Sequence, residues 1–325
     1  MTLLSRRLCL GAALLAAAAA GQAQSYPNRP VQLIAQQPPG SGSDAITRAW
    51  ADCAARGLGQ PVVVQNRPGA NGVLAVNTLK AQPADGYTLM SIGMSQMTIT
   101  PYVYRTAPYL PDKDFDDIGV LGTTPLVLTV PASLGITRLD QLGPLARGKA
   151  GGLDFGSPGK GSPAHLLTTA LVERLGVAGT HVPFVGESAG LTALMGEQIQ
   201  AMTLVIGTAV PHLKAGKLQA LALFGARRSP LLPQVPTVAE ALPAAAELAR
   251  PLWISIVARA GTPPAVLARL SEVTRACNAD AGYRTRMEGM NVTVTDSRPG
   301  EAREWAARDA QVWRPLIDRL GLATE

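Results

Sequence analysis

The strongest constraint on the fold is one stretch near the start of the chain, in which a short apolar run precedes a loop rich in proline and glycine. Val31 to Ala35 is apolar except for one residue, which is typical of a buried strand. The two prolines that follow exclude a helix there and keep the chain extended. Ser43 or Asp44 is a suitable N-cap for the helical pattern behind the loop. The stretch therefore predicts a strand, a glycine-rich loop and a helix.

The loop of this unit is a candidate anion site. Gly40 and Gly42 leave the backbone accessible, and the first amides of the next helix have no partner within that helix. The helix dipole adds a preference for negative charge at the same end. An ordinary strand-to-helix turn without a ligand is the alternative that this stretch alone leaves open.

Strand-like and helix-like segments alternate from end to end, so the predicted fold class is α/β. The loops Gly156–Gly161 and Val185–Glu187 also connect an apolar strand with a helix, and Ser162 and Ser188 are the expected N-caps. Ligands of open α/β sheets bind where strands end and helices begin. We therefore expect a cleft between two domains that brings the three loops together.

Three other segments complete the expected order of elements. Residues 93–98 follow a strand and are expected to form a polar loop. Residues 252–258 are an apolar strand that is expected to return to the first domain. Residues 292–295 alternate Val and Thr, which predicts a further strand.

Residues 1–23 have the pattern of a secretory signal peptide, with Arg6 and Arg7 at the basic end, an apolar core and small residues at the cleavage site. The apolar run is shorter than the roughly 20 residues that a membrane span requires. Loss of the two arginines lowers the formal net charge from +6 to +4, and no basic stripe is visible. We expect an exported, periplasmic protein of two domains with a mild attraction for anions and no nucleic-acid partner.

Cys53 and Cys277 remain after export, and both lie on predicted helices. Two buried thiols are the expected state of this pair. A disulfide is the alternative, because an oxidising compartment permits one.

Sequence motifs for catalysis and for metal binding are absent. The chain has no Gly-x-Ser-x-Gly, and its glycine-rich loops fit neither the dinucleotide-binding pattern nor the phosphate loop. The three histidines have no cysteine or carboxylate at metal-ligand spacing, so we expect no metal and no cofactor. The pairs Ser43–Asp44 and Ser162–His165 lack the third partner of a hydrolase, and His165 is placed to orient its loop. The protein is therefore predicted not to be an enzyme.

A set of short motifs occurs in one order along the chain. They are Tyr26-Pro27-Asn28-Arg29-Pro30, Pro38-Pro39-Gly40 with Asp44, Asn66-Arg67-Pro68-Gly69-Ala70, Pro83-Ala84-Asp85-Gly86-Tyr87-Thr88-Leu89, Asp114-Phe115, His165-Leu166, His181-Val182-Pro183-Phe184, Gly216-Lys217-Leu218, Val235-Pro236-Thr237 and Gly261-Thr262-Pro263. With these motifs the chain resembles the extracytoplasmic solute receptors of the tripartite tricarboxylate transporter type, the Bug proteins, from about residue 26 to residue 320. The set as a whole is highly specific, whereas each motif alone is weak.

The resemblance implies a periplasmic binding protein-like fold, in which two α/β domains are joined by a two-strand hinge with the ligand cleft between them. Residues 26–125 with 253–325 are expected to form domain 1, and residues 126–252 domain 2. We expect a monomer that captures a small carboxylate-containing metabolite by cleft closure and delivers it to membrane transporter subunits of the tripartite tricarboxylate type. A receptor for a signalling partner, a sensor kinase, is the alternative, because both roles need the same closure.

The resemblance also implies that backbone amides, hydroxyls and ordered water hold one ligand carboxylate. The expected ligand-binding residues are Gly40, Ser41, Gly42, Ser43, Asp44, Ser95, Ser157, Gly159, Lys160, Gly161, Ser162, His165, Phe184, Gly186 and Ser188. Lys160 is expected either to attract the anion at long range or to be a solvated lysine.

Four residues depart from the pattern of the family. Gln37 replaces a usual aromatic residue, and Ser41 interrupts a run of glycines. Val185 replaces a usual lysine, and Leu204 a common acidic residue. These departures leave the expected fold intact and leave the identity of the carboxylate open.

Overall fold

The structure, a computed structural model, describes residues 26–104 and 108–323, so the expected signal peptide lies outside the described residues. The strands are β1 (Val31–Ala35), β2 (Val62–Asn66), β3 (Thr88–Gly93), β4 (Phe115–Thr124), β5 (Leu126–Pro131), β6 (Leu153–Ser157), β7 (Gly179–Pro183), β8 (Ala201–Val205), β9 (Leu218–Phe224) and β10 (Leu252–Arg259).

Helices connect these strands along the whole chain. The α-helices are α2 (Gly42–Leu58), α3 (Val73–Lys80), α4 (Met94–Thr98), α5 (Thr100–Val103), α6 (Pro111–Asp114), α7 (Leu142–Arg147), α8 (Pro163–Arg174), α9 (Glu187–Met195), α10 (Ile206–Lys214), α11 (Val238–Ala241), α12 (Pro264–Ala279), α13 (Ala281–Gly289) and α14 (Glu301–Arg319). The 3₁₀ turns are η1 (Ala70–Gly72), η2 (Ala132–Leu134), η3 (Leu139–Gln141) and η4 (Pro243–Leu248).

The strands form two five-stranded sheets, and we call each sheet with its helices a lobe. The strand order is β2-β1-β3-β10-β4 in lobe 1 and β7-β6-β8-β5-β9 in lobe 2. In each sheet the first three strands run parallel, and the fourth strand is antiparallel to both of its neighbours. Two mixed sheets with helices between the strands confirm the predicted α/β class.

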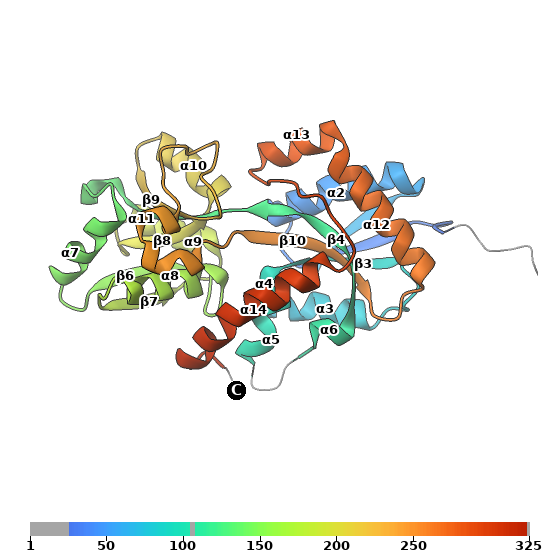
Figure 1. The fold of residues 1–325 in the computed structure, drawn as a ribbon, viewed down its shortest axis with the longest axis horizontal. Helices are drawn as coiled ribbons and strands as arrows, with labels where there is room; N and C mark the ends of the chain where they lie inside the picture. The colour runs from blue at the N-terminus through green and yellow to red at the C-terminus, as the bar shows by residue number, and fades with distance from the viewer. Residues whose placement is uncertain (1–25, 105–107, 324–325) are drawn as a thin grey trace, which may run out of the picture.

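The chain passes between the lobes twice (Figure 1). Pro125 alone separates β4 of lobe 1 from β5 of lobe 2. Residues 225–251, which include α11 and η4, lead back to β10. The predicted return of residues 252–258 to the first sheet is therefore confirmed. The domain borders at residues 125–126 and 252–253 follow these two crossings closely and stay a prediction.

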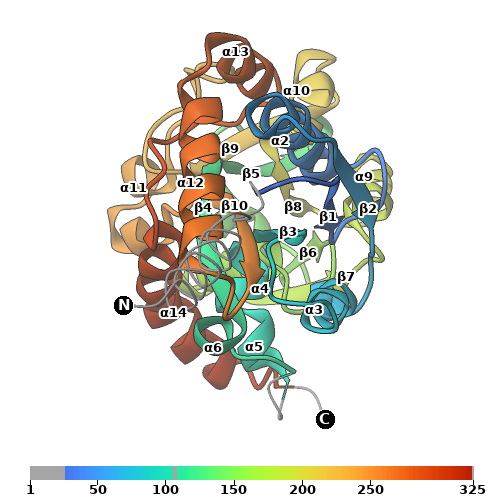
Figure 2. The ribbon, with the colours of Figure 1, turned by 90° about the vertical axis from the view of Figure 1, so that its right-hand side faces the viewer.

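Apolar side chains cover both faces of the lobe 1 sheet. Trp50 of α2 is fully buried in the apolar cluster that lies between this sheet and the helices α2 and α12. The other face packs against α3, α4 and α14, with α2 and α3 on opposite sides in Figure 2. This second cluster continues into lobe 2, because it contains Trp313 of α14 together with Leu166 and Leu171 of α8. The two lobes therefore share a continuous apolar contact on the side of α14.

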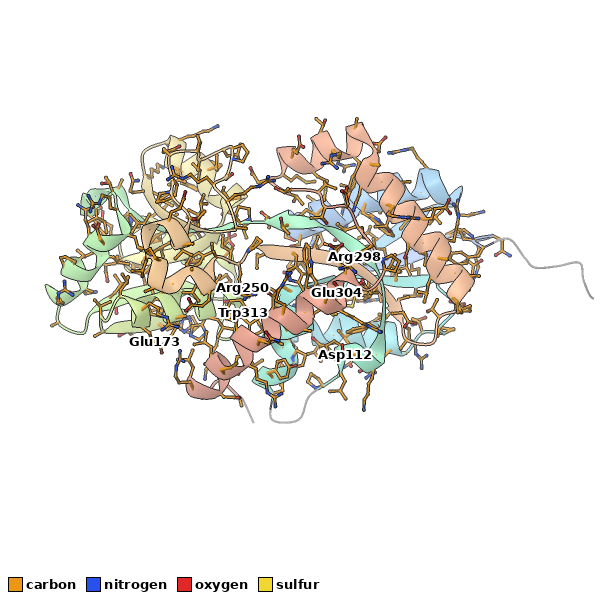
Figure 3. The ribbon with its side chains drawn as sticks, viewed as in Figure 1. Asp112, Glu173, Arg250, Arg298, Glu304 and Trp313 are labelled. Atoms are coloured by element: carbon orange, nitrogen blue, oxygen red, sulfur yellow. A yellow bond between two sulfur atoms is a disulfide. The ribbon has the colours of Figure 1, made fainter. Side chains whose placement is uncertain are left out.

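Polar contacts fasten α14 at the junction of the lobes (Figure 3). Arg250, just before β10, donates from Nη1 to Oδ1 of the buried Asp309 at 2.6 Å, and Nε1 of Trp253 donates to Oδ2 at 2.8 Å. At the far end of the helix, Arg319 pairs with Glu173 of α8 at 2.5 Å. One carboxylate thus holds the second crossing segment against the last helix.

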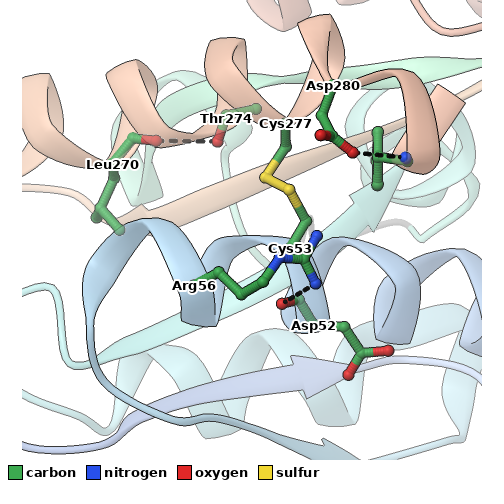
Figure 4. Close-up of a disulfide and its surroundings, with 8 residues drawn as sticks. Asp52, Cys53, Arg56, Leu270, Thr274, Cys277 and Asp280 are labelled. Atoms are coloured by element: carbon green, nitrogen blue, oxygen red, sulfur yellow. Dashed lines mark hydrogen bonds between the residues drawn. A yellow bond between two sulfur atoms is a disulfide. The ribbon is translucent and has the colours of Figure 1, made fainter.

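Cys53 of α2 and Cys277 of α12 form a disulfide, with their Cα atoms 5.9 Å apart (Figure 4). The expectation of two free buried thiols is wrong. The two helices cover the same face of the lobe 1 sheet side by side, which brings together residues separated by 224 positions. Such a contact depends on the tertiary fold and has no local signal in the sequence.

Two local predictions are also wrong. Residues 93–98 contain the helix α4 instead of a loop, and the side chain of Gln96 accepts a hydrogen bond from the Gly93 N–H at its start. Residues 292–295 form only an isolated bridge between Thr293 and Thr123. Val292 and Val294 nevertheless pack into the lobe 1 core. The alternation of Val and Thr therefore reflects burial of the two valines, although these residues do not pair as a strand of the sheet.

Candidate functional site

The first glycine-rich loop begins its helix earlier than the sequence predicts. Ser41 is the N-cap of α2, since its backbone is extended and its Oγ accepts a hydrogen bond from the Asp44 N–H at 3.2 Å. The expected caps, Ser43 and Asp44, lie inside the first turn. Among the described residues, the N–H groups of Gly42 and Ser43 have no hydrogen-bond partner. The start of α2 therefore presents two free donors and the positive end of a 17-residue helix.

Asp44 holds this loop in shape. Its Oδ2 accepts from the Gly40 N–H and from Arg48 Nε, both at 2.9 Å, and its Oδ1 accepts from Asn66 Nδ2 at 2.7 Å. Burial raises the pKa of Asp44, but the hydrogen bonds from Arg48, Asn66 and Gly40 outweigh it and leave the pKa below the usual value. The carboxylate stays charged, and both of its oxygens already accept hydrogen bonds from the protein.

A narrow hollow, too tight in this form of the protein to admit a water molecule, lies beside this loop at the carboxyl ends of β1 and β3. Its lining consists of Ala35, Gln36, Gln37, Ser43, Asp44, Thr47, Ser91 and Ile254. The Thr47 and Ser91 hydroxyls are 2.8 Å apart in its wall. Gln36 is only 8% exposed, and its Oε1 has no hydrogen-bond partner among the described residues. Such an orphaned buried amide needs an explanation, and a bound polar group supplies one.

Ser95 lies in the first turn of α4, next to the same strand ends. It is half-buried, and Gln96 beside it ties α4 to η1 through a bond from Nε2 to the Asn71 carbonyl at 3.1 Å. Gly72 has a positive φ of 89°, and a Cβ there would lie 2.5 Å from Gln36 Oε1. The close approach at Gly72 keeps the Gln36 amide in place.

Most backbone N–H groups of the second glycine-rich loop, between β6 and α8, donate to partners within the loop or at the start of α8. Ser162 caps α8 as predicted and accepts from the His165 N–H at 3.2 Å. The Gly159 N–H donates to Ser157 Oγ at 3.2 Å, and the Gly161 N–H to His165 Nδ1 at 3.1 Å. The N–H groups of both glycines are therefore already bonded to nearby side chains, and a ligand-binding role for Gly159 and Gly161 stays a prediction. Among the described residues, the N–H of the exposed Lys160 remains without a partner.

His165 and His181 stack in this loop with their ring centroids 3.6 Å apart and an interplanar angle of 23°. Burial, and to a smaller extent the neighbouring His181 and Lys160, lower the pKa of His165 to about 3. Burial and Lys160 lower the pKa of His181 to about 4. Both rings are therefore neutral at physiological pH, as a stacked pair beside a lysine requires.

The third loop begins α9 at Glu187, with Gly186 as N-cap at a positive φ of 89°. The prediction that Ser188 is the N-cap is wrong, because Ser188 lies exposed in the first turn of α9. Glu187 Oε2 accepts from the Val205 N–H at 3.3 Å, while its buried Oε1 has no partner among the described residues. Burial raises the pKa of Glu187, although Thr208 and the Val205 N–H lower it in part. The half-buried Phe184 packs between β6 and α9, since its ring would lie 3.1 Å from a Cβ on Gly156 and 3.2 Å from a Cβ on Gly190.

The loops of the two lobes approach each other through α5. A Cβ on Gly161 of lobe 2 would lie 3.2 Å from Val103 Cγ1 of lobe 1. The hollow itself is lined by lobe 1 residues alone. The structure therefore places the predicted residues in two groups of loops, Gly40 to Asp44 with Ser95 on lobe 1 and Ser157 to Ser188 on lobe 2, and the second group touches lobe 1 at Val103.

Sequence reasoning missed several polar residues at these loops: Gln36, Thr47, Ser91, His181 and Glu187. Thr47 was detectable, because it lies four residues after Ser43 on the same helix face. Gln36, Ser91 and His181 sit inside strands or next to them and Glu187 begins α9, and only the packed fold shows whether a polar side chain at such a position is buried.

Neither a metal-ligand cluster nor a membrane-spanning helix occurs among the residues that the structure describes. No group of three or more His, Cys, Asp or Glu is arranged to hold a metal ion in the part of the chain that the structure describes. Within those same residues, no helix combines the length and the apolar character needed to cross a membrane.

Two mixed α/β lobes joined by two crossings define a periplasmic binding protein fold. The model of the tripartite tricarboxylate transporter family receptor matches residues 46–322, and the chain belongs to this family of solute-binding receptors. BugT of Bordetella pertussis is 30% identical over 305 residues, which cover 94% of this chain and 93% of BugT.

Solved structures with bound acids are similar to this chain over almost its full length. Rpa4515 of R. palustris with adipate superposes with a TM-score of 0.83 at 27% identity, covering 92% of this chain and 99% of that protein. MatC from Rhodopseudomonas palustris with bound malate gives a TM-score of 0.79 at 27% identity, covering 90% and 100%. The predicted resemblance to Bug-type receptors is confirmed.

Proposed function

We propose that this protein captures a small carboxylate-containing metabolite between its lobes and delivers it to membrane transporter subunits of the tripartite tricarboxylate type. The observation that carries the proposal is the pair of unpartnered N–H groups of Gly42 and Ser43 at the start of α2, beside a polar hollow. A helix N-terminus with free amides binds carboxylates well. The acids named in the two similar R. palustris structures, adipate and malate, support the same ligand class.

The expected affinity follows from a few charge-assisted hydrogen bonds. Each contributes roughly 1.5–3 kcal/mol. Three or four of them, after the costs of ordering and desolvation, support a dissociation constant of about 1 μM. The donors would come from Gly42, Ser43, Ser95 and the Lys160 amide, with Lys160 adding long-range attraction.

Gln36 is proposed to contact a second polar group of the ligand. Its amide is buried at the hollow and unsatisfied at Oε1, and the hollow is lined mainly by polar side chains. No aromatic residue lines this hollow, so stacking on a ring is not part of the recognition proposed here. Because Oε1 only accepts hydrogen bonds, the proposed ligand class is an acid that also carries a donor, such as a hydroxyl or an N–H group.

Binding is proposed to close the lobes about the two crossings, with residues 26–125 and 253–325 as one body and residues 126–252 as the other. The ligand stabilises the closed form only if it contacts both lobes. The site residues predicted on both lobes fit this requirement. We propose that the protein acts in the periplasm as a monomer, without catalysis, metal or cofactor. Contact of the closed form with a sensor kinase remains the alternative output.

A thermal-shift screen of the exported chain against aliphatic mono-, di- and hydroxy-acids tests the ligand class. An acid present at 100 times its dissociation constant adds about 2.7 kcal/mol of stability, which raises the melting temperature by about 4 °C for a chain of this length. Matched amines and sugars serve as controls and should give no shift. If no acid raises the melting temperature, the proposed function is wrong.

A further inference from the structure

The conformation of the second glycine-rich loop depends on a histidine outside the predicted site. His181 lies on β7 and pairs in register with Phe155 of β6. Its Nε2 is 2.7 Å from Ser157 Oγ, the residue that ends β6 and begins the loop. Ser157 Oγ in turn bonds the Gly159 carbonyl at 2.9 Å and accepts from the Gly159 N–H. The imidazole therefore orients the hydroxyl that closes the first half of the loop.

The second half of the loop depends on the same side chain through stacking. His165 lies flat against His181 and accepts the Gly161 N–H at Nδ1. A neutral imidazole that accepts at Nδ1 carries its proton on Nε2. Removal of the His181 ring would leave His165 with one open face and a less defined orientation.

The contacts in both halves of the loop determine which backbone N–H group stays free to bind a ligand. Gly159 and Gly161 direct their N–H groups to Ser157 and His165, and Ser162 directs its N–H to the Gly159 carbonyl at 3.1 Å. The Lys160 N–H, at the tip between them, has no partner among the described residues. The loop is thus arranged to present a single amide.

We propose that His181 is a positioning residue of the ligand site: through Ser157 and His165 it holds the loop from Ser157 to Ser162 in the form that presents the Lys160 amide. The inference rests on the proposed function, since it assigns a role within the same site. His181 itself donates nothing to the ligand. Lys160 is the charged group of this loop that faces the pair, and its charge favours neutral rings.

Binding measurements on variants test this role, with the acid selected in the thermal-shift screen as the probe. His181→Phe keeps a flat ring for stacking and removes the bond to Ser157, whereas His181→Gln restores a polar group. We expect His181→Phe to weaken binding five- to twentyfold, mainly by faster dissociation, and His181→Gln to recover affinity to within threefold. Thr180→Ala, an exposed neighbour on the same strand, should change affinity less than twofold.

A double-mutant cycle separates positioning from general destabilisation. If His181 acts through Ser157, combining His181→Phe with Ser157→Ala should weaken binding no further than the stronger single change. Additive losses, or unchanged affinity of His181→Phe, would overturn the proposal. Should His181→Phe fail to fold, the cycle can be run with His181→Leu, which also removes the bond to Ser157.

Nitrogen NMR of the histidines reports their protonation states in the free protein, without any ligand. It therefore distinguishes failure of this inference from failure of the proposed function. We expect His165 to be neutral at pH 7 with its proton on Nε2, and His181 to be neutral, in both the free and the bound protein. His212, the third histidine, provides a separate signal for reference. A charged His165 or His181 at pH 7, or a His165 proton on Nδ1, would overturn the positioning role. A screen in which no acid binds would overturn the proposed function and this inference with it.

Discussion

Single polar side chains decide how each loop of the site is shaped. Asp44 and His165 were both predicted as ligand contacts, and in the structure each accepts a hydrogen bond from a glycine N–H of its own loop. We therefore propose that both residues act on binding by shaping their loops. Gln36 shows the opposite pattern, because the structure leaves its buried Oε1 without a partner.

Replacing Asp44 tests the conformational role of that carboxylate. Asp44→Asn keeps the shape of the side chain but loses the charge that Arg48 pairs with. We expect ligand affinity to fall about tenfold and the free energy of unfolding to fall by about 1–3 kcal/mol, because a buried charged hydrogen-bond network is broken. Calorimetric titration and urea unfolding measure the two effects. Asp52→Asn, an exposed change on the same helix, should alter stability by less than about 0.5 kcal/mol; equal effects of both changes would contradict the role of Asp44.

The stacked histidines predict how stability depends on pH. In the folded protein their pKa values are about 3 and about 4, below the unfolded value of about 6.5, so the unfolded chain binds more protons between these limits. Stability should therefore be complete above about pH 6.5 and fall as the pH falls toward 4, with a slope that approaches about 1.4 kcal/mol per pH unit for each histidine. Urea unfolding at pH 7, 6 and 5 measures this slope. A variant without both histidines should show a flatter profile, and an identical profile would contradict the assignment.

At the scale of elements, the unit of strand, loop and helix was predictable where its signals are local. Ser162 caps α8 as expected, because a serine followed directly by a proline is a strong start signal. The cap of α2 was misplaced, since Ser41, Ser43 and Asp44 all suit that position. Burial of Gln36 and the contact of His181 with Ser157 depend on packing between distant segments, so no single stretch of sequence predicts them.

The disulfide between α2 and α12 is the clearest tertiary feature that the sequence left open. It joins two helices of lobe 1 and closes a loop of 224 residues that includes all of lobe 2, and bridges of this kind stabilise by about 2–5 kcal/mol. We expect the Cys53→Ser, Cys277→Ser double variant to melt several degrees lower while binding the same acid, because Cys53 lies about three helical turns along α2 from Gly42 and Ser43. Thiol titration of the unfolded protein provides the check: two free thiols in the untreated protein would contradict the bridge.

The molecule as a whole combines a shared apolar contact with two narrow crossings. α14 packs on both lobes, with Asp309 tied to Arg250 and Trp253, while Pro125 and the segment before β10 connect the sheets. The two groups of loops lie on the strand ends that face the junction. This arrangement fits a receptor whose lobes move as bodies about one side and enclose a ligand on the other.

A crystal structure of the protein with the acid selected by thermal shift tests the central claim most directly. We predict that one ligand carboxylate lies within about 3.2 Å of the Gly42 and Ser43 N–H groups, and that the same ligand also contacts the loop between Ser157 and Ser162. A ligand bound by one lobe alone, or bound away from the start of α2, would contradict the proposed capture between the lobes.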